Sequence, residues 1–187
     1  MAIYHLSVKS GRQYGSSGSR GASHYAYINR EGKYKREDLE NIKSDKAAEI
    51  SVTKNLYKKI KTTNGNELID LTKETLKTGD LITIRLIIKT ENDLEFVHLK
   101  DLRASCFEPI NVISNYQRKY NLNYYMSTKD VATHFFFDTI KKGTYVLEYD
   151  VRINNSGSFN DGIATIQSMY APEFSGHSIS NKINVIE

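Results

Sequence analysis

Apolar and polar side chains alternate along much of the chain between residues 81 and 174. Within residues 81–88 every second side chain is apolar, which places four residues on one face: Ile82, Ile84, Leu86 and Ile88. Thr83, Arg85 and Lys89 fall on the other face. Because successive side chains of a strand point to opposite faces, this spacing predicts a half-buried β-strand.

Two later segments are also predicted to be strands. In residues 144–151 one face carries Tyr145, Leu147, Tyr149 and Val151, opposite Glu148, Asp150 and Arg152. A third strand is predicted over residues 162–170. Turn-forming residues separate the predicted strands at residues 78–80, 141–143 and 154–157. The pattern therefore predicts short strands joined by turns.

The series of predicted strands begins at Ile50. The strand that opens there is followed by Asn64 and Gly65, a pair that strongly favours a hairpin turn. Further strands are predicted within residues 68–71, 94–109 and 124–138. Residues 50–187 are therefore predicted to form one mainly β domain.

The first 49 residues have a different character. Residues 1–9 alternate and predict an opening strand, whereas residues 10–23 are rich in Gly and Ser and predict a flexible loop with Arg12 and Arg20. A short helical or turn segment is predicted next, around His24, Tyr25 and Tyr27, and Gly32 is its expected stop.

Residues 36–49 are highly charged and contain few apolar side chains. They predict a solvated helix that serves as a linker. We therefore expect a short α/β appendage over residues 1–49, followed by the β domain over residues 50–187.

Composition agrees with a β domain that has a modest core. Hydrophobic residues make up 39% and charged residues 26%, and the aromatic residues comprise 13 Tyr and 7 Phe without Trp. Tyr and Phe pack well on the pleated surface of a sheet. The single Cys106 excludes an internal disulfide.

Charge and the N-terminal sequence restrict partners and location only weakly. The net charge is +4, and most of the excess lies in the first fifty residues, which is compatible with a polyanionic partner. No apolar run is as long as a membrane span, and the N-terminus lacks the pattern of a signal peptide. We therefore expect no membrane span and a cytoplasmic location for the chain as written.

A first resemblance to a known family lies in residues 1–45. It rests on residues 1–9, on the loop at residues 10–23 and on residues 27–34, which resemble the start of MobA/MobL-type plasmid mobilisation relaxases. Those enzymes nick a plasmid transfer origin through a tyrosine and stay joined to the 5′ phosphate. The resemblance implies DNA as the partner and Tyr27 as the catalytic nucleophile, with Tyr25 as a second candidate. A divalent metal would neutralise the charge that develops on the phosphate.

One part of that family's pattern is missing. The family binds its metal through a downstream His-x-His motif, whereas none of the five histidines here lies within four residues of another: His5, His24, His98, His134 and His177. We therefore interpret residues 1–45 as a truncated and inactive relaxase, in which Tyr27 is a packing aromatic residue. A working DNA-nicking enzyme is the alternative.

A second and longer resemblance covers residues 50–187. The matching blocks occur in the same order, at residues 80–86, 96–104, 107–109, 124–125, 135–138, 142–149 and 162–174. They resemble the C-terminal macroglobulin domain of bacterial α2-macroglobulin-like proteins. The resemblance implies an antiparallel β-sandwich at the tail of a large protease trap that is exported to the periplasm or cell surface. It also implies protein partners, either other macroglobulin-family domains or a protease complex.

The chain departs from that parent family in the chemistry of covalent trapping. Cys106 lies in residues 105–109, which lack the Cys-x-Glu-Gln run of a thioester. The sequence also lacks a thioester domain, a bait region and an export signal upstream of residue 50. We therefore expect this polypeptide not to trap proteases covalently.

The remaining candidate side chains have structural interpretations. Cys106 is predicted to be a small buried residue, and His98 is predicted to face solvent or the sheet rim. His134 and Asp138 have the spacing of a metal pair on a helix, but they lie in a predicted strand, so a structural role is favoured. Two tyrosine clusters, Tyr116 with Tyr120 and Tyr124 with Tyr125, either form a partner-binding surface or cover the sandwich, and we favour the interpretation that they cover it.

The sequence thus predicts a mainly β protein whose folded part is a non-catalytic structural or interaction domain without a cofactor. The alternative function is that of a DNA relaxase-type transesterase, which would use Tyr27 and a divalent metal. Whether the chain is an enzyme depends on residues 1–45.

Overall fold

The computed structural model describes residues 24–28, 34–38, 44–46, 49–63, 65–71, 75–119 and 121–187. The elements in these residues are all β-strands. They are β1 (His24–Ile28), β2 (Tyr34–Asp38), β3 (Asp45–Lys46), β4 (Ile50–Thr62), β5 (Gly65–Asp70), β6 (Leu76–Lys77), β7 (Leu81–Thr90), β8 (Leu94–Leu102), β9 (Phe107–Pro109), β10 (Asn115–Lys119), β11 (Leu122–Thr128), β12 (Ala132–Ile140), β13 (Gly143–Ile153), β14 (Gly157–Asn160), β15 (Ala164–Ser168), β16 (Ser175–His177) and β17 (Lys182–Ile186). In this part of the chain no helix is long and apolar enough to cross a membrane.

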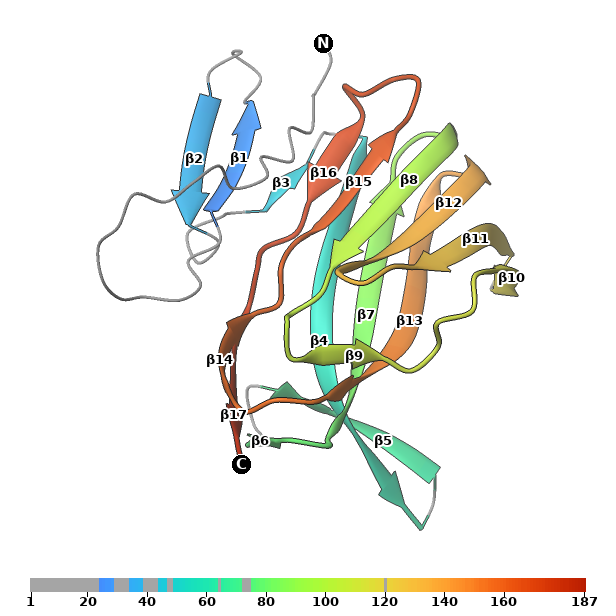
Figure 1. The fold of residues 1–187 in the computed structure, drawn as a ribbon. Coiled ribbons are helices and arrows are strands. Elements are labelled where there is room, and N and C mark those ends of the chain that lie inside the picture. Colours follow the sequence, from blue (N-terminus) through green and yellow to red (C-terminus); the bar gives the residue numbers. More distant parts are fainter. Residues whose placement is uncertain are drawn as a thin grey trace.

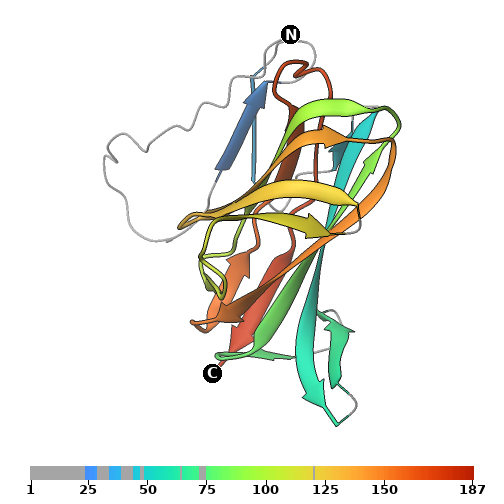
Figure 2. The ribbon, with the colours of Figure 1, turned by 90° about the vertical axis from the view of Figure 1, so that its right-hand side faces the viewer.

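Two sheets form a sandwich (Figure 1, Figure 2). The seven-stranded sheet has the order β10-β11-β12-β8-β15-β16-β3, and the five-stranded sheet has the order β5-β4-β7-β13-β9. Their strand pairs are antiparallel. A small sheet, β14-β17-β6, contains one parallel pair, β17 with β6. The prediction of a mainly β, antiparallel sandwich is confirmed.

The facing sides of the two sheets bury one hydrophobic core. In β7 the predicted apolar face is completely inaccessible to solvent, with 0% exposure for Ile82, Ile84, Leu86 and Ile88. The seven-stranded sheet contributes Leu99, Phe135 and Phe137 to the same core. Burying a side chain of this size contributes roughly 1.5–3 kcal/mol. The predicted faces of residues 81–88 are therefore confirmed.

The predicted hairpin after β4 is also confirmed. β4 and β5 pair from Tyr57 opposite Asp70 to Thr62 opposite Gly65. Gly65 has a φ of 126°, which glycine adopts without the steric cost that a Cβ would add. In both views the β4–β5 hairpin extends beyond the end of the sandwich (Figure 1, Figure 2).

The third predicted strand is shorter than expected, since β15 begins only at Ala164. Gly162, just before it, has a φ of 70°, which interrupts the extended backbone. A Cβ at Gly162 would lie 2.6 Å from the Cβ of Leu102, so this close approach of two segments requires glycine.

The helical or turn segment and the linker helix predicted for the N-terminal residues are wrong where the structure describes them. Residues around Tyr25 and Tyr27 form β1, which pairs with β2, and β2 includes the start of the predicted linker helix. The end of that linker forms β3, which pairs with β16. Tyr and Ile in β1 favour extended backbone, and strand pairing outweighs the weak helix preference of charged residues. The strand predicted at residues 1–9 and the loop at residues 10–23 lie outside the described residues.

Candidate interaction surface

Aromatic side chains form a row across the outer face of the seven-stranded sheet. Strand pairing places Tyr116 of β10 opposite Tyr125 of β11, Tyr125 opposite Phe136 of β12, and Phe136 opposite His98 of β8. Side chains directly opposite each other on paired strands are in reach of one another. These four residues, which we call the aromatic row, therefore lie side by side.

The rings of the aromatic row contact one another but do not bury one another completely. The ring centroids of Tyr116 and Tyr125 are 4.9 Å apart, and those of His98 and Phe136 are 4.6 Å apart and nearly parallel. The centroids of Tyr125 and Phe136 are 6.4 Å apart. These separations lie in the range of favourable aromatic pairs. Tyr116 nevertheless remains 80% exposed, so much of the row still faces solvent.

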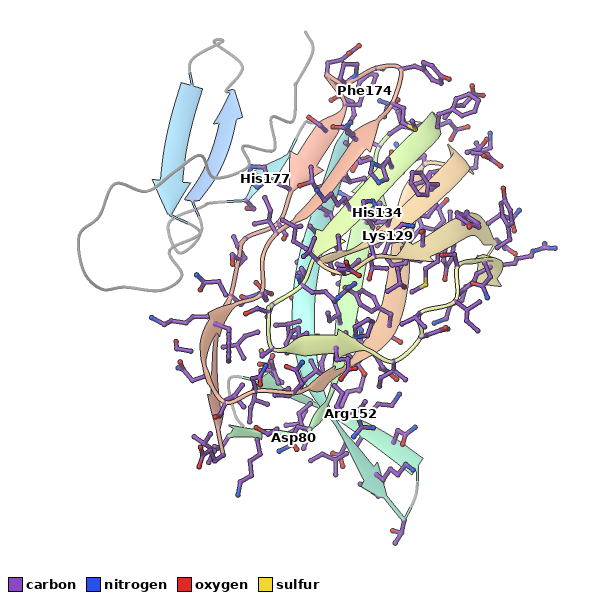
Figure 3. All side chains as sticks on the ribbon, in the orientation of Figure 1. Asp80, Lys129, His134, Arg152, Phe174 and His177 are labelled. Atoms are coloured by element: carbon purple, nitrogen blue, oxygen red, sulfur yellow. The ribbon has the colours of Figure 1, made fainter. Side chains whose placement is uncertain are left out.

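A second group of exposed apolar side chains lies at the tip of the β15–β16 hairpin. The rings of Phe96 and Tyr170 meet edge to face with centroids 5.1 Å apart, and Tyr170 is 80% exposed. Met169 is also exposed, and its backbone N–H donates to the carbonyl of Phe96. We call Phe96, Met169 and Tyr170 the hairpin tip. Phe96 and Tyr170 line a hollow of about 530 Å³ together with Phe174, which Figure 3 labels at the β15–β16 hairpin.

The backbone of Phe96 is unusual. Its φ is 50°, in the left-handed region that bulky side chains rarely adopt. Such a conformation costs about 1–3 kcal/mol and persists only when surrounding contacts hold it. Here the contacts with Met169 and Tyr170 hold the ring of Phe96 on the surface, next to the hairpin.

The tyrosines of the two clusters named from the sequence do not all have the same role in the structure. Tyr124 is only 4% exposed, and its hydroxyl donates to Oε1 of Gln117 at 2.9 Å. Burial raises the pKa of Tyr124. Tyr124 thus covers the core, whereas Tyr116 and Tyr125 lie on the outer face. Tyr120 lies outside the described residues.

His98 and His134 lie together, which the sequence did not predict. Nε2 of His98 is 2.9 Å from Nδ1 of His134, and their rings are stacked with centroids 5.2 Å apart. Burial lowers the pKa of His134, and the positive charges of Lys100, Lys129 and Arg103 lower it further (Figure 3). In the part of the chain that the structure describes, no group of three or more His, Cys, Asp or Glu side chains could hold a metal ion.

The predicted interpretation of Cys106 is confirmed. It is a free cysteine with 0% exposure, and burial raises the pKa of its thiol to about 11. The thiol is therefore protonated at neutral pH and is a poor nucleophile.

The two candidate nucleophiles of the relaxase interpretation both lie in β1. Tyr27 is paired with Lys35 and Tyr25 with Glu37. Their proposed role in DNA nicking stays a prediction.

Comparison with known proteins gives one family match. The model of the bacterial alpha-2-macroglobulin MG10 domain matches residues 50–173. A search of curated proteins gave no match.

Similar solved structures come from two bacteria. A tyrosine-to-glycine mutant of Salmonella alpha-2-macroglobulin is 16% identical with a TM-score of 0.62, and the match covers 78% of this chain and 10% of that one. A native Escherichia coli alpha-2-macroglobulin fragment from domain MG7 to the C-terminus is 15% identical with a TM-score of 0.62. That match covers 77% of this chain and 24% of the fragment. Escherichia coli alpha-2-macroglobulin activated by porcine elastase is 14% identical with a TM-score of 0.61. That match covers 78% of this chain and 14% of the other. The chain therefore shares their fold but spans only a small part of their length.

Proposed function

Since the chain belongs to the family of bacterial alpha-2-macroglobulin MG10 domains, we propose that residues 50–187 act as a non-catalytic interaction domain. The domain binds another macroglobulin-family domain through the aromatic row and the hairpin tip. The observation that carries this proposal is the aromatic row, whose rings contact one another while Tyr116 and Phe136 remain exposed.

The chemistry of both surfaces suits a protein partner. Tyrosine and phenylalanine are enriched in protein interfaces, and tyrosine is frequent among the residues that contribute most to binding. Neighbouring rings in the aromatic row restrict one another, so little side-chain freedom remains to be lost on binding. A docked domain would cover Tyr116 and Tyr170, which are the most exposed aromatic side chains of the described residues.

A neighbouring domain is a better candidate than a protease. The match covers only 10% of the Salmonella relative, so in that protein the matching domain is one part of a much larger molecule. The Escherichia coli relative is described as activated by porcine elastase, which keeps a protease complex as the second candidate partner.

Site-specific photocrosslinking tests the proposal. Benzoylphenylalanine placed at residue 116 or 170 of the full chain in its host cells should crosslink to a macroglobulin-family domain, identified by mass spectrometry. The control is the same amino acid at Ile186, which is 48% exposed on the small sheet. Crosslinks that are no stronger than those at the control, or that map to a protease, would overturn the choice of partner.

The relaxase alternative concerns residues 1–45 and requires its own assay. Supercoiled plasmid with the cognate transfer origin and Mg²⁺ should remain intact with the wild-type chain if this segment is inactive. Nicking that Tyr27→Phe abolishes would instead establish DNA transesterase activity. The domain boundary between residues 49 and 50 stays a prediction. The cytoplasmic location expected for the chain as written also stays a prediction.

A further inference from the structure

A cluster of charged side chains is buried between the two sheets. Lys54 belongs to β4 of the five-stranded sheet, Asp101 to β8 of the seven-stranded sheet, and Asp161 to the segment before β15. All three side chains are 0% exposed. Nζ of Lys54 is 2.8 Å from Oδ1 of Asp101 and 3.7 Å from Oδ2 of Asp161.

The amine of Lys54 and the carboxyl of Asp101 are close without a well-directed hydrogen bond between them. Nζ donates to the backbone carbonyls of Leu102 at 2.7 Å and Asp161 at 2.8 Å. Oδ1 of Asp101 accepts no hydrogen bond of good geometry from the described residues. An amine acts as a nucleophile through its lone pair, so bond formation requires that one proton first passes from Nζ to the carboxyl beside it.

The other oxygen of Asp101 has a strong donor. The hydroxyl of Tyr149 donates to Oδ2 of Asp101 at 2.6 Å. Burial and the neighbouring Asp101 carboxylate raise the pKa of Tyr149, so the phenol remains protonated. A donor in this position stabilises negative charge on Oδ2, as in an oxyanion hole.

Asp161 is positioned to move protons. Its carboxylate accepts hydrogen bonds from the backbone N–H and Nδ2 of Asn181 and from Oγ of Ser180. Burial raises the pKa of Asp161, which brings it closer to that of a general base and acid in neutral solution. The cluster therefore contains an amine, a carboxyl, an oxyanion donor and a proton carrier.

We propose that Lys54 and Asp101 join in an intramolecular isopeptide bond. Nζ attacks Cγ of the protonated Asp101 carboxyl, and the charge that forms on Oδ2 is held by Tyr149. Asp161 takes one proton from Nζ and gives it to the Oδ1 hydroxyl, which leaves as water. One N–C bond forms, one C–O bond breaks and one water is released, without an oxidant or a cofactor. Fixed proximity in a dry core supplies the rate.

The bond would tie the two layers of the sandwich together. It joins β4 to β8, and thus closes the chain from residue 54 to residue 101 into a loop. A covalent link of this kind restricts the unfolded chain in the way that a disulfide does. The cluster is buried and shares no residue with the aromatic row or the hairpin tip, so this inference is independent of the proposed function.

Mass spectrometry of the intact, folded full chain tests the bond. The wild-type mass should be lower than the sequence mass by one water. Trypsin should release a branched peptide that joins residues 47–58 to residues 101–103, because an acylated Lys54 is not cleaved. Folding of the same sample is checked by its thermal transition.

Two variants separate the roles of the residues. Lys54→Arg removes the nucleophile, and Asp161→Asn keeps both reacting groups but removes the proton carrier. Both should have their full sequence mass and no branched peptide. A folded wild-type chain with its full sequence mass would show that Lys54 and Asp101 form only an ion pair and would overturn the proposal. Complete crosslinking in Asp161→Asn would overturn the role of Asp161.

Discussion

The two outer faces of the sandwich are covered differently. On the five-stranded sheet, Nε of Arg85 lies 2.6 Å from Oε1 of Glu148, and Nζ of Lys59 lies 2.7 Å from Oδ2 of Asp150. The seven-stranded sheet carries the aromatic row instead. The ion pairs satisfy their own charges and remain hydrated, whereas the rings leave apolar surface in contact with water. The outer face of the five-stranded sheet therefore needs no partner to cover it, whereas the outer face of the seven-stranded sheet is suited to binding a partner.

The inner sides of the two sheets, in contrast, are alike. In each sheet a buried apolar residue is followed by a residue on the outer face. In β7, Ile84 is followed by Arg85 of an ion pair, and in β12, Phe135 is followed by Phe136 of the aromatic row. Each pair therefore places a core-facing and an outward-facing side chain next to each other on the same strand, so that substitutions at the two can be compared. Substitutions at these two pairs separate what the core needs from what each outer face needs.

The largest effect is expected at the first pair. Ile84→Asp places an unpaired charge in the core at a position with 0% exposure, and should cost more than about 4 kcal/mol, enough to unfold a marginal domain. Arg85→Asp loses the partly exposed pair with Glu148 and the contact of the guanidinium with the Tyr57 ring, and should cost about 1–2 kcal/mol. Urea unfolding followed by circular dichroism measures both. Equal effects would show that the register of β7 is wrong.

A smaller effect is expected at the second pair. Phe135 is 2% exposed, and Phe135→Ala should cost about 3–5 kcal/mol because it leaves a cavity. Phe136 contacts the rings of His98 and Tyr125 on the surface, so Phe136→Ala should cost no more than about 1.5 kcal/mol. The same urea titration compares them. A cost at Phe136 as large as at Phe135 would mean that the aromatic row serves the fold rather than a partner.

The core was predictable from the sequence because its information is local. Spacing alone assigned Ile84 inward and Arg85 outward, since a strand alternates its faces at every residue. The turn after β4 was predictable from Asn64 and Gly65 for the same reason. The helical or turn segment predicted around Tyr25 and Tyr27 is wrong because pairing with β2, a longer-range contact, decides the structure of β1.

The surface and the buried cluster were less predictable because they depend on the pairing of distant strands. From the sequence, Tyr116 and Tyr125 were favoured as cover of the sandwich over a partner surface, because their alignment with Phe136 and His98 requires the register across four strands. Lys54 and Asp101 belong to different sheets, and no local pattern relates them. Their approach becomes visible only when the two sheets pack.

The smallest effect should come from His134, which lies beside the aromatic row. Burial and the charges of Lys100, Lys129 and Arg103 lower its pKa from the ordinary value of 6.5, so the unfolded chain binds this proton more tightly than the folded chain. Above that value both states are neutral and stability is unaffected. As the pH falls from 6.5 towards the lower pKa of the folded state, stability decreases. The Tm of the wild type should therefore decrease slightly over this range, and His134→Gln should reduce the decrease. An NMR titration of the His134 ring that gives a midpoint at or above the ordinary value would contradict this prediction, and would mean that the outer face of the seven-stranded sheet favours a charged histidine.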